Sequence, residues 1–142
     1  MRSRFVALAA VASAIAALPV SAHHSAAGYD LKKTLSAPAT IKEFRWGAPH
    51  SSGVFMVKGP KGEQQELSAS SAAPAMFRKS GFNPRDFKVG EKVEISWHPT
   101  RSGKPGGILS SIKFADGREF KDQEFIKQIE ALEAVDHAKA TP

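Results

Sequence analysis

The chain has 142 residues, with 20 Lys and Arg, 14 Asp and Glu, a formal net charge of +6 and no Cys. This length suits one domain that can bury a hydrophobic core of its own. The lack of Cys excludes disulfide frameworks, thiolate metal sites and cysteine nucleophiles. The positive charge alone would favour a nucleic-acid partner, so the charges must first be located along the chain.

Residues 1–22 have the pattern of a cleavable export signal. Arg2 and Arg4 precede an uncharged stretch of apolar and small residues over 5–18, and Pro19 and the small residues Val-Ser-Ala follow it. Signal peptidase requires small residues at these places, and the stretch is shorter than the roughly 20 residues of a membrane span. We therefore predict a mature chain that begins at His23. The alternatives are an uncleaved membrane anchor or a buried helix.

Removal of this signal lowers the net charge by two and leaves the other Lys and Arg scattered among Glu and Asp. They form no basic run, no RNA-recognition pattern and no helix-turn-helix pattern, so we expect no nucleic-acid partner. No second stretch is apolar enough to span a bilayer. Together with the Ala-rich signal of bacterial type, these features predict a soluble periplasmic protein.

The first part of the mature chain predicts an extended segment and three strands. Residues 23–38 show little periodicity and are expected to form an extended N-terminal segment. The strand expected over 39–46 alternates imperfectly, as a strand with a bulge does. The apolar residues 54–57 and the polar residues 63–68 flank a turn with two glycines, which indicates a hairpin.

A short helix is expected next, over 72–79. A serine of the Ser70-Ser71 pair can cap its unpaired N–H groups, and Pro74 falls in its first turn, where a missing donor costs little. Gly81 provides the stop. This helix separates the first three predicted strands from the later ones.

Two more strands and a tight turn complete the predicted domain. Residues 92–97 alternate cleanly, and the Gly- and Pro-rich stretch that follows is expected to be a flexible loop. Asp116-Gly117 indicates a tight turn into 118–120. The strand between the loop and this turn is expected over 108–114, with a shared face of Ile108, Ser110, Ile112 and Phe114.

The tail from Asp122 differs in kind, because apolar residues recur there at helical spacing. This periodicity predicts a C-terminal amphipathic helix within 121–142. Such a stripe usually packs on its own domain. Docking onto a protein partner or self-association through the helix is the open alternative, since a complete set of strands precedes it. The apolar residues are Phe125, Ile126, Ile129, Leu132 and Val135.

Three strands, one helix and two more strands form the element order of the OB-fold, a small Greek-key barrel. We therefore predict a mainly β protein. Its domain at 39–120 is expected to be a small OB-like, partly open β-barrel of about five to six strands, with one inserted short helix and the C-terminal helix after it. This fold hosts many functions, so function must be argued from particular residues.

Several short motifs of the chain recur together in one known family. They are the start His23-His24-Ser25 with Tyr29-Asp30, the motif Trp46-x-x-Pro49-His50, the turn 88–93 and the ending 115–120. On these motifs the chain resembles the family of small exported bacterial proteins catalogued as domain of unknown function 6152, over about residues 23–120. The resemblance implies export and a small β-barrel, and it supplies no activity. Ala48 departs from the family pattern, which usually has Asn there.

The histidines form the strongest candidate constellation for a site. Cleavage before His23 would leave its α-amino group, of pKa roughly 7.7–8.0, beside its own imidazole, and the two can chelate one metal ion. His24 or His50 would complete a three-nitrogen set, which suits Cu(II). The simpler hypothesis is adventitious binding at a solvated terminus, with His50 fixing a turn and His98 in a capping or surface role.

Other kinds of site have weaker support. The carboxylates form no pair at motif spacing, and neither a Gly-x-Ser-x-Gly elbow nor a phosphate-binding loop occurs, so we expect no enzymatic activity. Trp46, Phe55 and Trp97 could form a stacking platform on the barrel. Burial in the core is the more common place for aromatic residues in so small a domain.

The sequence thus predicts an exported, periplasmic, non-enzymatic binding protein with a Cu(II) site at His23, His24 and His50. Apart from copper(II), no cofactor is expected. The alternative is a ligand-binding or protein-interaction module that uses the aromatic barrel face or the C-terminal helix.

Overall fold

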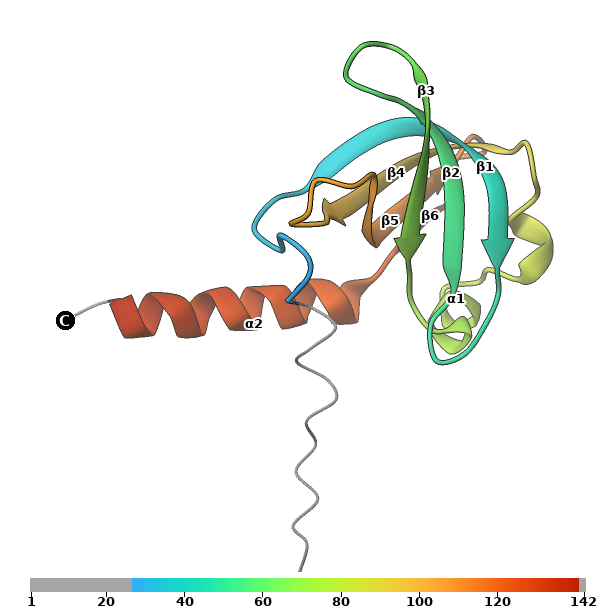
Figure 1. The fold of residues 1–142 in the computed structure, drawn as a ribbon. Helices are drawn as coiled ribbons and strands as arrows, with labels where there is room; N and C mark the ends of the chain where they lie inside the picture. The colour runs from blue at the N-terminus through green and yellow to red at the C-terminus, as the bar shows by residue number, and fades with distance from the viewer. Residues whose placement is uncertain (1–26, 141–142) are drawn as a thin grey trace, which may run out of the picture.

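The computed structural model describes residues 27–140 (Figure 1). The predicted signal at 1–22 lies outside the described residues, as do His23 and His24. Within residues 27–140, no helix combines the length and the apolar character that crossing a bilayer requires.

Six strands form one sheet, in the order β3-β2-β1-β4-β5-β6. A parallel pairing of β3 with β5 joins the two sides of this sheet and closes a five-strand barrel. The predicted OB-like order is therefore confirmed. The strands are β1 (Leu35–Arg45), β2 (Ser52–Lys58), β3 (Gln64–Ser70), β4 (Lys92–Pro99), β5 (Gly106–Phe114) and β6 (Glu119–Lys121), and the helices are α1 (Pro74–Lys79), the 3-10 helix η1 (Pro84–Asp86) and α2 (Gln123–Ala140).

The long strand β1 belongs to both sides of the barrel. Its first half pairs with β4 and its second half with β2, and a register shift between Ile41 and Glu43 confirms the predicted bulge. The strand begins at Leu35, four residues before the predicted start. Its inward positions there include Ala37 and Ala39, which are too small to give a clear hydrophobic alternation.

A second register shift, between Ser96 and Trp97, changes which residues of β5 face the core. It places Leu109 opposite Trp97, so Leu109 is buried in the core while Ile108 is only half-buried. The predicted face of β5 was therefore wrong at Ile108 and right at Ile112 and Phe114. A bulge of this kind reverses the inward and outward positions beyond it.

Two glycines at the start of β5 allow the barrel to close. A Cβ at Gly106 would lie 2.7 Å from the carbonyl oxygen of Ser68 in β3, and one at Gly107 would lie 2.1 Å from that of His98 in β4. Only a residue without a side chain permits such close backbone approach on both sides. Closure of the barrel therefore depends on this glycine pair.

The helix α1 covers one end of the barrel with an aromatic cluster. Phe77 of α1 is fully buried, 4.1 Å from the ring of Phe120, and Phe44 stacks on Phe87 at 4.0 Å. The predicted stop is confirmed, because the glycine that follows the helix has a φ of +85°. The predicted serine cap was wrong: Ala73 is the N-cap and no side chain caps the helix.

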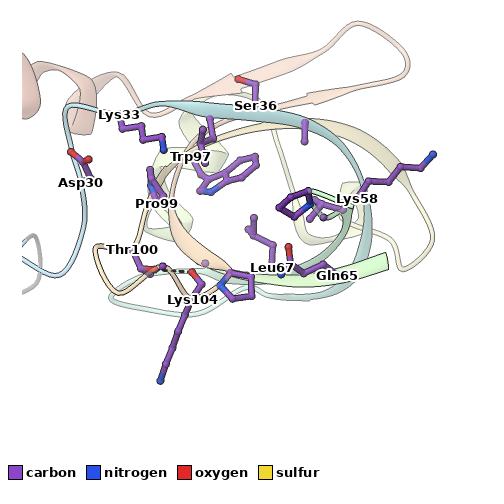
Figure 2. Close-up of a pocket in the computed structure, with 18 of the residues that line it drawn as sticks. Asp30, Lys33, Ser36, Lys58, Gln65, Leu67, Trp97, Pro99, Thr100 and Lys104 are labelled. Atoms are coloured by element: carbon purple, nitrogen blue, oxygen red, sulfur yellow. Dashed lines mark hydrogen bonds between the residues drawn. The ribbon is translucent and has the colours of Figure 1, made fainter. Parts of the chain in front are cut away.

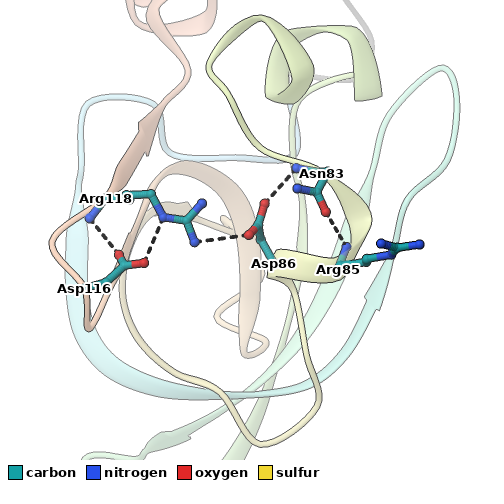
Figure 3. A network of polar contacts seen from close by, with 5 residues as sticks. All are labelled: Asn83, Arg85, Asp86, Asp116 and Arg118. Atoms are coloured by element: carbon teal, nitrogen blue, oxygen red, sulfur yellow. Dashed lines mark hydrogen bonds and ion pairs between the residues drawn. The ribbon is translucent and has the colours of Figure 1, made fainter.

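An arginine ties the turn between β5 and β6 to η1 (Figure 3). The guanidinium of Arg118 donates to Asp116 at 2.8 Å and to Asp86 at 3.1 Å, and it lies 5.2 Å from the centre of the Phe82 ring. Asp86 also accepts a hydrogen bond from the backbone N–H of Asn83, at 2.8 Å. These contacts fix the loop between α1 and β4 on the barrel wall.

The helix α2 packs on the barrel only at its start. Ile129 is buried and Phe125 and Ile126 are half-buried, whereas Leu132 and Val135 are 46% and 50% exposed. Figure 1 shows the rest of the helix extending away from the strands. The predicted helix is confirmed, and its apolar stripe meets its own domain along the first half alone.

We predict that Gly107→Ala lowers the free energy of unfolding by about 1–3 kcal/mol, because the added methyl group displaces the backbone of β4 or β5. Gly28→Ala is the matched control, since a Cβ there meets nothing within 4 Å. The control should change the stability by less than about 0.5 kcal/mol. Urea denaturation followed by circular dichroism measures both values, and equal stabilities of the two variants would contradict this account of closure.

Candidate ligand-binding groove

A groove of about 750 Å³ lies at the end of the barrel opposite α1. The strands β1, β3 and β5 begin at this end and β2 and β4 end there, so the loop between β2 and β3 and the loop between β4 and β5 surround it. We call this hollow the mouth groove. Among residues 27–140, a helix covers only the opposite end of the barrel.

The floor of the mouth groove is apolar. It consists of Leu35, Val57, Leu67 and Trp97, each contributed by a different strand. Figure 2 shows Leu67 and Trp97 pointing toward the centre of the barrel. Leu35 is half-buried and the other three are buried, so a ligand seated here would remove only a small apolar area from water, at roughly 25 cal/mol for each Å² that is covered.

The rim of the mouth groove is basic. It carries Lys33, Lys58, Arg101 and Lys104, all of them exposed, against the single carboxylate of Asp30. Among residues 27–140, none of the four cations takes part in an ion pair. The rim therefore presents uncompensated positive charge above an apolar floor, which attracts anions.

Hydrogen bonds hold the loop between β4 and β5 that carries two of these cations. The hydroxyl of Thr100 donates to the carbonyl of Lys104 at 2.7 Å, and Gly103 turns the chain with a φ of +75°. The backbone N–H of Arg101 donates to the carbonyl of Gly28 at 2.9 Å. The stretch predicted as a flexible loop is thus tied to the N-terminal segment.

His98 has a structural role beside the groove. It is buried at the end of β4, where its Nδ1–H donates to the carbonyl of Lys33 at 3.0 Å. Its ring meets the ring of Phe125 edge to face, with 5.6 Å between the centres. The imidazole therefore joins the N-terminal segment, the barrel and α2, and this internal position corrects the predicted capping or surface role.

The other predicted site residues do not line the mouth groove. His50 is exposed in the loop between β1 and β2, at the α1 end, and His23 and His24 lie outside the described residues. Phe55 is fully buried, and Trp46 is half-buried near Phe77 at the α1 end. The three aromatic residues considered as a stacking platform therefore share no exposed face, and only Trp97 reaches the groove.

At the α1 end, Asp122 begins the helix α2. Its carboxylate accepts a hydrogen bond from the backbone N–H of Phe125 at 3.0 Å, as an N-cap does. Burial raises the pKa of this carboxyl above its ordinary value of 3.8, against the opposing effects of that hydrogen bond and of the nearby His50.

Comparison with known proteins places the chain in a family. The model described as "Family of unknown function (DUF6152)" matches residues 10–110. The chain belongs to this family. The predicted resemblance is therefore confirmed, and the match to DUF6152 includes every residue that lines the mouth groove. The strand β6 and the helix α2 lie beyond the match, and no curated protein or solved structure matches the chain.

The sequence did not reveal the mouth groove, because its residues come from separate segments. Lys33, Lys58 and Lys104 are far apart in the chain and have no shared motif. The one available signal was the Gly- and Pro-rich loop with its lysine and arginine between two strands. Its position at the barrel mouth depends on the closure of β3 against β5, which no local pattern shows.

We predict opposite pH effects for two carboxylates. Because the pKa of Asp122 is raised in the folded protein, folding favours its protonated form. Its contribution to the free energy of unfolding therefore increases as the pH falls through that pKa and decreases as the pH rises. Asp122→Asn keeps the cap and removes the buried charge, so it should be at least as stable as the parent at pH 7, and this advantage should shrink at pH 3.

Asp116 provides the matched control, because hydrogen bonds from Arg118 lower its pKa. Its stabilising contribution is present above pH 3.8 and is lost as the pH falls from there through the lowered folded-state pKa. Asp116→Asn should therefore destabilise the protein at pH 7 and have less effect in acid. Urea unfolding at both pH values measures the two variants, and the same sign of pH dependence in both would contradict the assignment.

Proposed function

We propose that this protein is an exported, periplasmic, non-enzymatic binding module whose mouth groove takes an anionic ligand with an apolar portion. The observation that carries this proposal is the division of the groove into an apolar floor and a basic rim. An apolar group would lie against the groove floor, while an acidic group would meet the rim cations.

The composition of the lining supports binding in preference to catalysis. Asp30 is its single carboxylate, and no histidine lines the groove beside it. The lining therefore has neither a carboxylate pair nor a histidine–carboxylate pair, two common arrangements for general acid-base chemistry. Ligand sites are typically concave and mostly apolar, with a few polar groups that fix the orientation, and the mouth groove has this form.

We predict that the double variant Arg101→Glu/Lys104→Glu binds dodecanoate at least about tenfold more weakly than the parent. Each reversal replaces an attraction of about 1 kcal/mol by a repulsion, and about 1.4 kcal/mol corresponds to tenfold in affinity. Isothermal titration calorimetry at about 0.1 M salt measures the effect.

The double variant Lys79→Glu/Lys88→Glu is the control, because it makes the same change of charge away from the groove. Its affinity should stay within about threefold of the parent, since exposed charges beyond about 10 Å are screened at 0.1 M salt. Equal losses of affinity in the two double variants would show that net charge alone causes the effect. If the parent does not bind dodecanoate, the groove is not a site for fatty-acid anions.

A copper site is a second proposal, supported by the exposure of His50. Among residues 27–140, no three His, Cys, Asp or Glu side chains converge, so the site would depend on the predicted terminal amine and imidazole of His23, together with His24 or His50. One extra residue before His23 should then weaken Cu(II) binding by far more than tenfold. Titration of the exported protein with Cu(II) tests this, and equal affinity of the native and extended proteins would exclude the chelate.

A further inference from the structure

The strand β3 has an open edge beside the mouth groove. On one side it pairs with β2 over its full length, from Gln64 to Ser70. On the other side the pairing with β5 covers three residues, Ser68 to Ser70. In the described structure, the first half of β3 therefore has a strand neighbour on one side only.

The hydrogen bonds around β3 show which backbone groups face this edge. The carbonyl of Glu63 accepts from Gly59 on the β2 side, whereas the N–H of Ser68 is directed toward Pro105 on the β5 side. Backbone groups alternate between the two sides of a strand, residue by residue. The N–H and C=O groups of Gln64 and Glu66 therefore point to the open edge, and those of Gln65 and Leu67 point to β2.

This edge is continuous with the mouth groove. Gln65 and Leu67 lie on the groove side of the strand, and Figure 2 shows both beside the opening with Trp97 across from them. Lys104 extends from the loop that borders the same gap. A chain laid along the edge would thus have a hydrogen-bonding partner, an apolar floor and a cation within its reach.

Proteins usually protect such edges with proline, bulges or a covering loop. The open half of β3 has no proline and no register shift against β2. Its one charged side chain, Glu66, is paired with Lys42 on the outer face and so leaves the edge itself uncovered. An open edge of this kind is the element to which extended peptides add as a further strand.

We infer that the ligand of the mouth groove is an extended acidic peptide, which adds to the edge of β3 at Gln64–Leu67. This inference rests on the proposed function and names its ligand class. Alternate side chains of the peptide lie against the groove floor, and its carboxylates meet the basic rim. The excess of cations over Asp30 favours an acidic peptide over a neutral or basic one.

The probe for this inference is the peptide acetyl-(Val-Glu)3-amide, used with two N-methylated forms. One form carries N-methyl groups on the three valines and the other on the three glutamates. Because alternate N–H groups point to opposite sides of a strand, only one of the two forms should lose its bonds to β3. The edge offers two carbonyls, those of Gln64 and Glu66, and each bond contributes about 0.5–1.5 kcal/mol, so that form should bind roughly five- to 150-fold more weakly.

Amide hydrogen exchange supplies a readout at the edge itself. The amides of Gln64 and Glu66 should exchange faster than those of Gln65 and Leu67 in the unliganded protein, and saturating peptide should slow them at least about tenfold. Dodecanoate, which has no backbone groups, should leave them unchanged. Nuclear magnetic resonance of the purified protein measures all four amides in one sample.

The outcomes separate this inference from the proposed function. Binding of dodecanoate without binding of the peptide, or equal loss of affinity in both N-methylated forms, would overturn the peptide inference and leave the groove as a site for other anions. Equal binding of acetyl-(Val-Lys)3-amide would overturn the acidic preference. Binding of neither dodecanoate nor peptide would overturn both proposals. Slower exchange of Gln64 and Glu66 with rising protein concentration alone would assign the edge to a second copy of the chain.

Discussion

The close approach of three backbones at Gly106 and Gly107 is the constraint on which the architecture depends. At this point β5 passes between β3 and β4, and a Cβ on either glycine would overlap a carbonyl oxygen of a neighbouring strand. The contact turns a twisted sheet into a closed barrel. It also places the loop before β5, with Arg101 and Lys104, at the barrel mouth, so the basic rim is a consequence of the closure.

The two ends of the barrel have different chemistry because, among the described residues, a helix covers only one of them. At the α1 end, Phe77 completes an aromatic cluster that excludes water. At the other end, Trp97 and Leu67 are buried core residues, 8% and 3% exposed, that also line the bottom of the mouth groove. The same hydrophobic side chains therefore serve the stability of the domain and form the floor of a groove, which is a common origin of binding sites in small barrels.

Much of this fold could be predicted from the sequence, because its strands alternate and its turns contain Gly, Pro and Asp. The errors have local physical causes: small alanines hide the start of β1, and a bulge beside Trp97 turns Leu109 inward in place of Ile108. The candidate groove could not be predicted, because ring closure brings its residues together from distant segments. Histidines are common metal ligands, yet His98 has a structural role and His50 lies at the α1 end of the barrel, away from the groove.

The N-terminal segment before β1 lies between two hollows of the surface, the mouth groove and a cleft beside α2. Asp30 and Lys33 line the mouth groove, while Lys32 and its neighbours line the cleft under α2, where Lys32 reaches Asp136 at 3.7 Å. The carbonyl of Lys33 is held by His98, which also contacts α2. A ligand that moved this segment would also disturb its contacts with His98 and with Asp136 of α2. By thermodynamic reciprocity, a partner on α2 that moved the same segment would then alter the affinity of the groove by the same factor.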